Sequence, residues 1–465
     1  MVKERTRVLV VGGGCVGMNT ALRLQRRLRA EIRAGAVEIV MITSDPYMTY
    51  QPFLPEAAAG SISPRHVVVP LRRVLDGCRV IVGEVTGVEH GRRLARYTTA
   101  ASEERAVRNP SSPCGESIGY DEIVLAPGSV SRTLPVPGLA DHGIGFRTVE
   151  EAIGLRNHVL EQLDIAASTR DPEVREAALT FVFVGAGYAG VEALAELEDM
   201  ARYAVRHYNT IAPEDLRWVL VEASDRILPE VDERLARYAL TQLRHRNVDV
   251  RLCTRLRSCT DRVAVLDDGA RLPARTLVWT TGVRPSPMLA GTGLPLDDRG
   301  RLRCTEHLAV DGVPHAWAAG DAAAVPDLTA ATPGATVAPN AQHAVRQARV
   351  LADNLVRALR GEPQESYAHA RLGAVASLGL RKGVAQLRGR RLTGRAAWLL
   401  HRAYHLGRLP TLNRKARVLA EWTLAGLFAR EIVSLGSLEH PRAEFERAAG
   451  GKHPDDPTTD PNGSF

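Results

Sequence analysis

The sequence predicts an α/β fold in which a unit of strand, glycine turn, helix and strand occurs twice. Three observations indicate this fold. One such unit opens the chain, an equivalent unit starts near residue 179, and the composition, 45% hydrophobic and 24% charged, is that of an ordinary globular α/β protein. With 465 residues the chain is too long for one hydrophobic core, so roughly two to four domains are expected.

The first unit consists of a strand at 7–11, a helix at 17–30 and a strand at 37–42. Between the first strand and the helix, Gly12, Gly14 and Gly17 form a GxGxxG motif. Gly12 permits a tight turn, Gly14 lets the backbone approach a pyrophosphate, and Gly17 lets helix and strand pack closely. The helix amides then face the anion. Taken alone, this motif fits a dinucleotide site and a plain strand-helix turn equally.

The second unit repeats the motif with Gly185, Gly187 and Gly190, followed by a helix at 188–204 and a strand at 218–222. Glu222 ends that strand and can accept hydrogen bonds from both ribose hydroxyls of an adenosine. A 2′-phosphate would be repelled by its charge, so NADH is favoured over NADPH, although Arg226 nearby can soften that preference. Two motifs in this context predict two Rossmann-like dinucleotide-binding domains.

The remaining segments fill in the organisation of the chain. Residues 102–118 are polar and rich in Pro, Gly and Ser, which predicts a loop at the tip of a hairpin. Two further strand and turn units are expected at 274–285 and 315–323, followed by a helix at 339–359. Residues 441–465 combine four prolines with polar residues and are expected to form a disordered tail.

Six cysteines are scattered without a CxxC pair or zinc-type spacing, so no metal site is predicted. They are Cys15, Cys78, Cys114, Cys253, Cys259 and Cys304. The chain has no run of about 18 apolar residues, and its charged start leads directly into a strand. Neither a membrane-spanning helix nor a signal peptide is therefore expected.

With these motifs the sequence resembles the two-dinucleotide-binding flavoproteins of the pyridine nucleotide-disulfide oxidoreductase superfamily, and within them type II NADH:quinone oxidoreductases, over residues 5–435. The resemblance implies an FAD domain into which an NADH domain is inserted. The expected division is FAD domain 1–150, NADH domain 151–298, FAD domain again 299–365, a basic helical membrane-associating region 366–440, and the tail 441–465.

The resemblance also implies which residues bind FAD. Asp321, in an Ala-Gly-Asp element, would contact the ribityl and phosphate region, Gln51 would lie against the flavin, and the helix that starts near Pro339 would point at the pyrimidine edge of the flavin. Thr43 and Ser44 stand where the family usually has an acid for the ribose, with Asp45 close by. The expected set is Gly12, Gly14, Gly17, Thr43, Ser44, Gln51, Val85, Ala126, Gly128, Asp321, Ala341 and Gln342.

On the NADH side, the resemblance places Glu192 near the nicotinamide carboxamide, while Glu196, four residues on, is interpreted as a solvated helix charge. The expected NADH-binding residues are Gly185, Gly187, Tyr188, Gly190, Glu192, Glu222, Thr281 and Gly282. The candidates for a catalytic role are Gln342, His343, Lys382 and Glu192.

The expected reaction is hydride transfer from NADH to FAD followed by two-electron reduction of a quinone, without proton pumping. Disulfide reductases of this architecture carry a cysteine pair in the segment that here reads YMTYQPFLPEAAAG, which has none, so the flavin would pass electrons directly to the acceptor. Arg346 and Ala348 depart from the family's Gln-Gln-Gly near the quinone pocket. Two alternatives are a soluble NADH-dependent reductase with a non-quinone acceptor and a flavin redox sensor.

The positive charge of the chain, +7 overall, is concentrated near the C-terminus, where residues 366–420 contain 12 Lys or Arg and no Asp or Glu. This pattern predicts a helix that lies on an anionic membrane, with the enzyme cytoplasmic and peripheral on the inner face of the cell membrane. The alternative is a packed helix pair whose basic face meets solvent or another subunit, as in a homodimer. No specific nucleic-acid partner is expected.

Overall fold

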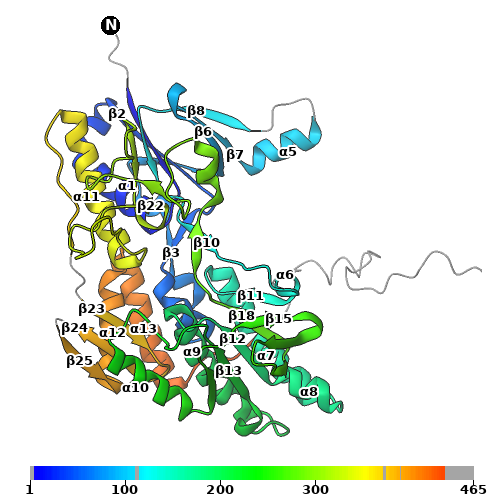
Figure 1. Cartoon of the computed structure of the whole chain (residues 1–465). Coiled ribbons are helices and arrows are strands. Elements are labelled where there is room, and N and C mark those ends of the chain that lie inside the picture. The colour runs from blue at the N-terminus through cyan, green and yellow to red at the C-terminus, as the bar shows by residue number, and fades with distance from the viewer. Residues whose placement is uncertain (1–4, 110–114, 370–372, 388, 435–465) are drawn as a thin grey trace, which may run out of the picture.

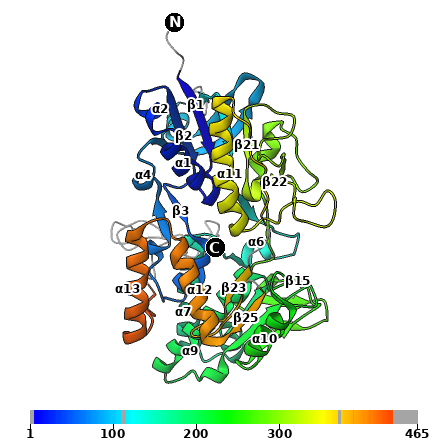
Figure 2. The same ribbon diagram turned by 90° about the vertical axis from the view of Figure 1, so that its left-hand side faces the viewer.

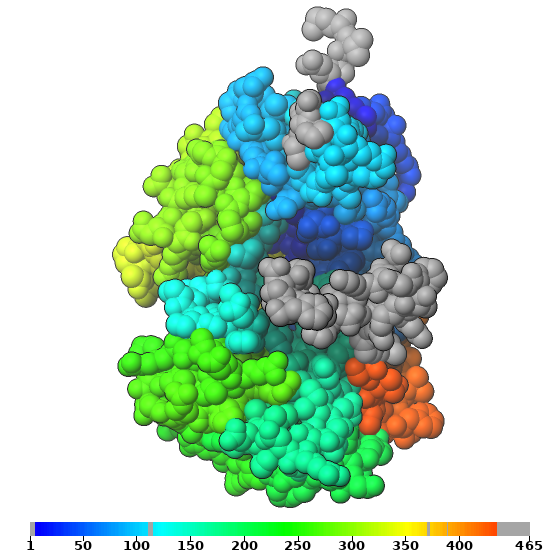
Figure 3. Space-filling view, turned by 90° about the vertical axis from the view of Figure 1, so that its right-hand side faces the viewer, coloured from blue at the N-terminus to red at the C-terminus, as the bar shows by residue number. Residues whose placement is uncertain are grey.

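The computed structural model describes residues 5–109, 115–369, 373–387 and 389–434. They form two α/β lobes, one above the other in Figure 1, with the C-terminal helices against the side of the lower lobe. Figure 3 shows a second face, on which the upper lobe is blue, cyan and yellow-green and the lower lobe is green and teal. Cys114 and the predicted tail at 441–465 lie outside the described residues.

A five-stranded parallel sheet organises the upper lobe, in the order β21-β9-β1-β2-β5. Its strands are β1 (Thr6–Val11), β2 (Val37–Thr43), β5 (Cys78–Val82), β9 (Glu122–Leu125) and β21 (Ala316–Ala318). Every residue of β2 is buried, as expected for a strand covered on both faces of a parallel sheet. Because β21 pairs with β9, the lobe is completed by chain that returns after the second lobe.

Two helices from opposite ends of this lobe's sequence pack together on the sheet, α1 (Cys15–Arg27) and α11 (Ala341–Arg360). Figure 2 shows them side by side. The other elements of the upper lobe are α2 (Arg29–Arg33), β3 (Tyr47–Thr49), β4 (Val68–Pro70), α4 (Leu71–Val74), β6 (Glu84–Glu89), η3 (His90–Arg92), β7 (Leu94–Thr98), α5 (Ala100–Arg108), β8 (Glu116–Gly119), η7 (Pro287–Thr292), β20 (Leu302–Arg303), η8 (Gly320–Ala322) and β22 (Ala323–Ala324). Between β3 and β4 the chain forms η1 (Gln51–Phe53), α3 (Leu54–Ala58) and η2 (Pro64–His66), and α3 packs in the hydrophobic core of the lower lobe.

The lower lobe holds a second five-stranded parallel sheet, in the order β11-β18-β12-β13-β14. Its strands are β11 (Gly143–Gly145), β18 (Thr276–Trp279), β12 (Thr180–Val184), β13 (Arg217–Val221) and β14 (Val248–Arg251). The helices and smaller elements are α6 (Leu139–His142), α7 (Val149–Ser168), α8 (Pro172–Ala178), α9 (Tyr188–Ala204), η4 (Val205–His207), η5 (Pro213–Asp215), α10 (Glu233–Arg244), β15 (Leu256–Ser258), η6 (Thr260–Arg262), β16 (Val263–Leu266) and β17 (Arg271–Pro273).

Two short strands carry the chain between the lobes. β10 (Ser129–Ser131) leads into the lower lobe and β19 (Val283–Pro285) leads out, and they pair antiparallel. The second sheet therefore begins with β11, and the boundary predicted at 150/151 falls within α7.

The C-terminal region consists of the antiparallel strands β23 (Gly373–Ser377), β24 (Gly383–Leu387) and β25 (Arg390–Thr393), then α12 (Gly394–Arg408) and α13 (Leu412–Phe428). Buried residues of these elements, including Ala376 and Val418, share one hydrophobic core with α9 of the lower lobe. Among the described residues, no helix is long and apolar enough to cross a membrane.

The predicted α/β fold with two dinucleotide-binding sheets is confirmed, and α9 has the predicted bounds. The predicted loop at 102–118 is wrong in part, because α5 covers Ala100–Arg108 and β8 begins at Glu116. The helix starts at a capping box, in which Thr99 and Ser102 exchange backbone and side-chain hydrogen bonds. The predicted helix at 17–30 ends at Arg27 and is followed by the separate helix α2.

Candidate functional site

One cleft of about 1440 Å³ runs between the two lobes and continues along α12. Its lining includes the first glycine turn, the crossing strand β10, the starts of α9 and α11, and the end of α12. The volume exceeds the ~300–1,000 Å³ of an ordinary small-molecule pocket. The cleft can therefore hold an extended ligand or two ligands in line.

The first glycine turn depends on residues that have no side chain. Gly12 has φ +96°, and a Cβ there would lie 2.3 Å from the carbonyl oxygen of Ala126. A Cβ on Gly17 would lie 1.9 Å from the oxygen of Gly12, whereas one on Gly14 would meet no atom within 4 Å. Gly12 and Gly17 are thus fixed by packing, and Gly14 leaves its approach from the cleft open, as a pyrophosphate cradle requires.

The end of β2 carries hydroxyls, but carboxylates lie close to it. Thr43 is buried, with its Oγ1 against Gly13, and the hydroxyl of Ser44 donates to Asp45. Asp45 and Glu84, both exposed, line the cleft together with these hydroxyls. Glu84 therefore adds an acid to the predicted ribose end that the sequence interpretation did not include. Val85, the next residue of β6, is buried and also lines the cleft.

Asp321 lies at the centre of a polar group on the upper wall of the cleft. Its carboxylate accepts a hydrogen bond from the Ser129 hydroxyl, and Arg147 donates to the same hydroxyl at 2.9 Å. Burial lowers the pKa of Arg147, while the nearby charge of Asp321 counteracts this shift. Gln51 reaches the same place, because its amide donates to the Arg147 carbonyl at 3.3 Å. All four side chains belong to residues that line the cleft, and Arg147 was not predicted from the sequence.

The late helix begins at the cleft as predicted. Asn340 caps it by accepting a hydrogen bond from the His343 amide, and Ala341 and Gln342 line the cleft. Gln342 also donates to the Gly373 carbonyl of β23 at 2.9 Å. His343 does not line the cleft, because its Nδ1 lies 2.7 Å from the hydroxyl of Tyr367 on the other side of the helix start.

Lys382, the other basic candidate, is not at the cleft. It lies in the turn between β23 and β24, whereas the cleft is lined by Gly373, Ala374 and Val375 near the opposite end of β23. Of the four catalytic candidates, the structure therefore brings Gln342 and Glu192 to the cleft and leaves His343 and Lys382 outside its lining.

The second glycine turn repeats the geometry of the first. Gly185 has φ +105°, a Cβ on Gly190 would lie 1.9 Å from the Gly185 oxygen, and one on Gly187 would meet no atom within 4 Å. Tyr188 and Gly282 line the cleft, as do Ala126 and Gly128 of the crossing segment. The predicted cofactor-binding residues that stay outside its lining are Gly17, Gly185, Gly187, Gly190, Glu222 and Thr281.

Glu222 is held at the end of β13 next to the second turn. One carboxylate oxygen accepts from the Ala186 amide at 2.7 Å, and the other accepts from the amide and hydroxyl of Ser224. Arg226 donates to the carbonyls of Pro229 and Val231. The guanidinium of Arg226 is thus held by its own loop and does not pair with Glu222, so the end of the strand carries the negative charge of Glu222.

Glu192 joins the cleft to the interior of the lower lobe. It is 7% exposed and lines the cleft. Its Oε1 accepts from the Ser377 amide at 2.8 Å and lies 3.2 Å from Nε2 of His401 on α12. Neither partner was predicted from the sequence.

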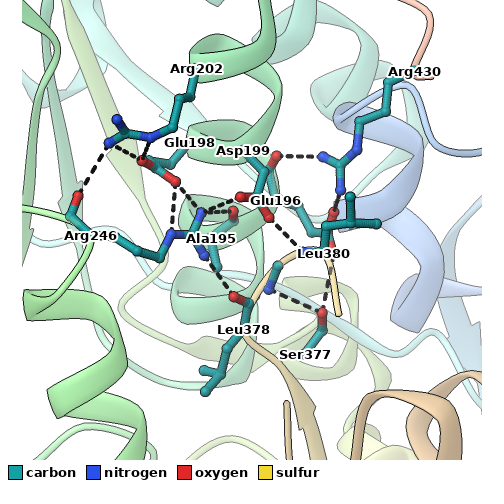
Figure 4. A network of polar contacts seen from close by, with 11 residues as sticks. Ala195, Glu196, Glu198, Asp199, Arg202, Arg246, Ser377, Leu378, Leu380 and Arg430 are labelled. Carbon is teal, nitrogen blue, oxygen red and sulfur yellow. Dashed lines mark hydrogen bonds and ion pairs between the residues drawn. The ribbon is translucent and has the colours of Figure 1, made fainter. Parts of the chain in front are cut away.

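The interpretation of Glu196 as a solvated charge is wrong. Glu196 is fully buried, because β23 and the segment after α13 cover this face of α9. It accepts from the Ser377 hydroxyl at 3.1 Å and pairs with Arg430 at 2.7 Å (Figure 4). Burial alone would raise the pKa of Glu196, but the charges of Arg430, Arg402 and Arg246 and the hydrogen bond from Ser377 together outweigh burial, so the pKa is lowered.

The same network continues along α9 (Figure 4). Glu198 pairs with Arg202 and Arg246, and Arg246 also pairs with Asp199 and donates to the Leu378 carbonyl at 2.7 Å. These contacts fasten the turn between β23 and β24 to α9. They thereby fix the position of β23 at the cleft.

The last turns of α12 form one wall of the cleft, with Tyr404, His405 and Arg408 in its lining. Nδ1 of His405 lies 3.1 Å from the hydroxyl of Tyr50, which lines the cleft from the upper lobe. The pKa of His405 is well below its usual value because of burial and the charges of His401 and Arg408. The region predicted to meet a membrane therefore also supplies part of the site.

Comparisons with known proteins agree with this geometry. The family model described as pyridine nucleotide-disulphide oxidoreductase matches residues 6–348. Curated relatives named type II NADH:quinone oxidoreductase, from Staphylococcus epidermidis and Staphylococcus aureus, are each 28% identical. The first match covers 90% of this chain and all of the relative, and the second covers 85% and 93%.

Two solved structures have the same fold. The structure of NDH2 from Plasmodium falciparum in complex with NADH has a TM-score of 0.82 at 16% identity, covering 92% of this chain and all of the other. The sulfide:quinone oxidoreductase from Aquifex aeolicus has a TM-score of 0.67 at 17% identity, covering 92% and 96%.

Proposed function

This chain belongs to the pyridine nucleotide-disulphide oxidoreductase family, and from that premise we propose that it is an FAD-dependent NADH dehydrogenase that reduces a membrane quinone without pumping protons. The family resemblance expected from the sequence is confirmed. The observation that carries the proposal is the single cleft that joins the cradle of the first glycine turn to the start of α9 after the second.

The residues of the upper lobe fit FAD. Gly14 offers an open cradle at the head of α1, Asp321 is held by Ser129 and Arg147, and the capped start of α11 points its amides at the cleft. Gly12, Gln51, Val85, Ala126, Gly128, Ala341 and Gln342 line the same stretch. When bound here, FAD supplies the hydride acceptor and the two-electron donor of the reaction.

The lower lobe would bind NADH. Glu222 would accept the ribose hydroxyls of the adenosine, and Tyr188, Glu192 and Gly282 would surround the nicotinamide end where they line the cleft. Alignment of the two rings in one cleft is the main contribution that the protein makes to hydride transfer.

The cysteines support a direct transfer of electrons from the flavin to the acceptor. Cys15 is the sole cysteine among the described residues that line the cleft, and burial raises the pKa of its thiol to about 11. A thiol that stays protonated is a poor nucleophile, and one cysteine cannot form the disulfide of a disulfide reductase. A quinone that enters along α12 would receive the electrons directly.

The surface of α12 and α13 supports attachment to an anionic membrane. Leu399, Leu412, Leu424, Leu427 and Phe428 are exposed on these helices, and basic residues of the same region accompany them. Such a surface binds anionic lipid by apolar burial and charge together. We propose that the enzyme lies on the inner face of the cell membrane. The alternative is that a second copy of the chain covers the same surface in a homodimer.

The test is an absorbance spectrum of the purified protein before and after NADH and then after a quinone. The proposal expects a flavin spectrum that NADH bleaches and a quinone restores, with faster turnover when anionic liposomes are present. Bleaching without recovery by any quinone would favour the soluble reductase with another acceptor. Slow bleaching and slow recovery in stopped flow would favour the redox sensor.

A further inference from the structure

Three arginines from three different helices line the part of the cleft that lies between α1, α11 and α12. They are Arg26 of α1, Arg349 of α11 and Arg408 of α12, and all three residues are exposed. Figure 2 shows α11, in yellow, above α12, in orange. We call these three residues the arginine mouth.

No carboxylate of these helices balances the charge of the arginine mouth. Neither α1 nor α12 contains an Asp or Glu, and Asp353, the one acid of α11, does not line the cleft. Asp353 pairs instead with Arg23 at 2.6 Å and with Arg27 at 3.5 Å. Within the described residues, none of the three arginines of the mouth has an ion pair with a carboxylate.

A fourth cation lies next to the arginine mouth. Arg346, one of the two departures from the family's Gln-Gln-Gly, is half-buried and donates to the Gln342 carbonyl at 3.0 Å. Burial lowers the pKa of Arg346, and the charge of Arg408 and then that of Arg349 lower it further, against the opposing effect of two tyrosines. Like charges in one another's field raise the free energy of the protonated arginines, and a bound anion removes this cost.

A solvated basic face does not explain the arginine mouth as a whole. Arg26 and Arg408 lie in the last turns of α1 and α12, where a cation stabilises the carbonyl end of a helix. Arg349 lies in the middle of α11, so the helix dipole does not explain its position. The three side chains come from separate helices and line one cleft, as the residues of a binding site do.

The chain next to Arg408 indicates which anion the arginine mouth binds. Leu409 and Pro410 continue the lining of the cleft, and Leu412, which starts α13 four residues after Arg408, is 83% exposed. A ligand at the mouth therefore meets positive charge and an apolar side chain together. An anionic lipid supplies both counterparts, a phosphate for the guanidinium groups and an acyl chain for the leucine, whereas free phosphate supplies only the first.

We propose that the arginine mouth binds the phosphate of one anionic phospholipid at the entrance through which the quinone reaches the cleft. The role of this lipid at a quinone entrance rests on the proposed function. Arg349 and Arg408 donate to the phosphate oxygens, and Arg26 adds positive charge. The bound lipid holds the entrance against the bilayer, so that a quinone passes from the acyl chains into the cleft without crossing water.

The experiment measures the binding of a single lipid apart from attachment to a membrane. The holoenzyme, saturated with NAD⁺ so that the nucleotide site is occupied, is titrated calorimetrically with dihexanoyl phosphatidylglycerol below its critical micelle concentration. Arg349→Gln and Arg408→Gln each remove one charge from the mouth. The control Arg395→Gln removes the same charge from an exposed position at the other end of α12, outside the lining of the cleft. Glycerol phosphate and dihexanoyl phosphatidylcholine are titrated in parallel.

The proposal expects one saturable site for phosphatidylglycerol in the wild type and in Arg395→Gln, with an affinity about tenfold lower or more in the two mouth variants, because each loses charge-assisted hydrogen bonds. Glycerol phosphate that binds as tightly as phosphatidylglycerol would make free phosphate the ligand and overturn the lipid. Equal binding of phosphatidylcholine, or an equal loss of affinity in Arg395→Gln, would indicate unspecific adsorption and overturn the site.

The entrance role is tested with a lipophilic quinone in vesicles of phosphatidylglycerol. Arg408→Gln is expected to raise KM for the quinone about tenfold with kcat changed by less than about twofold, and Arg395→Gln to leave KM unchanged. An unchanged KM in Arg408→Gln, despite its loss of lipid affinity, overturns the entrance role. A wild-type enzyme that binds the lipid but reduces no quinone overturns the proposed function and leaves the lipid site in place.

Discussion

The hydroxyl of Ser129 donates a hydrogen bond to the carboxylate of Asp321, across 192 residues of sequence. Ser129 begins the strand that leaves the upper lobe, and Asp321 follows the strand that completes it. The contact therefore joins the exit and the return of the chain at the wall of the cleft. Arg147, the first basic residue of the lower lobe at this wall, donates to the same hydroxyl.

Asp321→Ala is expected to weaken FAD binding by about ten- to a hundredfold, because a charge-assisted hydrogen bond contributes roughly 1.5–3 kcal/mol. The measurement is the ratio of flavin to protein absorbance after dialysis at a series of FAD concentrations. Asp298→Asn, an exposed change in the same lobe, is the control. Full flavin retention in Asp321→Ala would mean that this carboxylate does not face the cofactor.

Glu222→Gln is expected to raise KM for NADH by about tenfold and to narrow the preference for NADH over NADPH, because the negative charge that opposes a 2′-phosphate is removed. Steady-state rates with both nucleotides give the ratio of kcat/KM. Glu214→Gln, at an exposed position of the same lobe, should leave that ratio unchanged. An unchanged ratio in Glu222→Gln as well would remove Glu222 from the nucleotide site.

Arg430→Met is expected to lower the free energy of unfolding by about 3–5 kcal/mol at pH 7, because it removes the guanidinium that pairs with the fully buried carboxylate of Glu196. The pKa of Glu196 is lowered in the folded wild type, so its contribution is present above its unfolded pKa and is lost as pH falls through the folded one. In the variant, the largest of the charges that oppose burial is gone, so the pKa of Glu196 rises and protonation relieves part of the penalty.

The difference in unfolding free energy between wild type and Arg430→Met should therefore shrink from pH 7 to pH 5, as measured by urea denaturation. Arg417→Met, an exposed position of α13, is the matched control. Combining Arg430→Met with Glu196→Gln should recover part of the loss, since the buried charge is then gone. A difference in unfolding free energy that grows toward acid pH would contradict the ion pair between Arg430 and Glu196.

Leu424→Glu with Leu427→Glu is expected to release the protein from vesicles of anionic lipid, with at least a tenfold lower partition, because apolar burial and charge attraction are both reduced. Co-sedimentation with vesicles at low and high salt measures the effect. Val107→Glu, on α5 and 82% exposed, should bind as the wild type does. If wild-type protein stays in solution and instead loses a dimer in the double variant, the surface is a subunit interface.

The glycine turns were predictable because their geometry is local. A GxGxxG between a strand and a helix sets both the positive φ of Gly12 and Gly185 and the close packing of Gly17 and Gly190. The bounds of α9 followed from hydrophobic periodicity for the same reason. Asp321 was found through its motif, although its partner Ser129 was not.

The site residues that the sequence did not predict are placed by contacts between distant parts of the chain. Glu196 has the sequence context of an exposed helix charge, and its burial is decided by Arg430, 234 residues away. Arg147 and Glu84 belong to no motif, and only the folded cleft places them beside Ser129 and Asp45. Lys382 matched a basic candidate near the cofactor, but its hairpin turns it away from the cleft. The positions of such side chains follow from tertiary packing rather than from the local sequence pattern.

The pairing of β21 with β9 also dictates an order of events on the ribosome. Residues that complete the upper sheet leave the exit tunnel only after all five strands of the lower sheet have been synthesised, so the lower sheet can form while the upper sheet is still incomplete. Nascent chains stalled near residue 325, with β18 outside the tunnel and β21 still inside it, should therefore protect the lower sheet from protease and leave β1 and β9 cleavable. FAD binding would then be among the last steps in the folding of this protein.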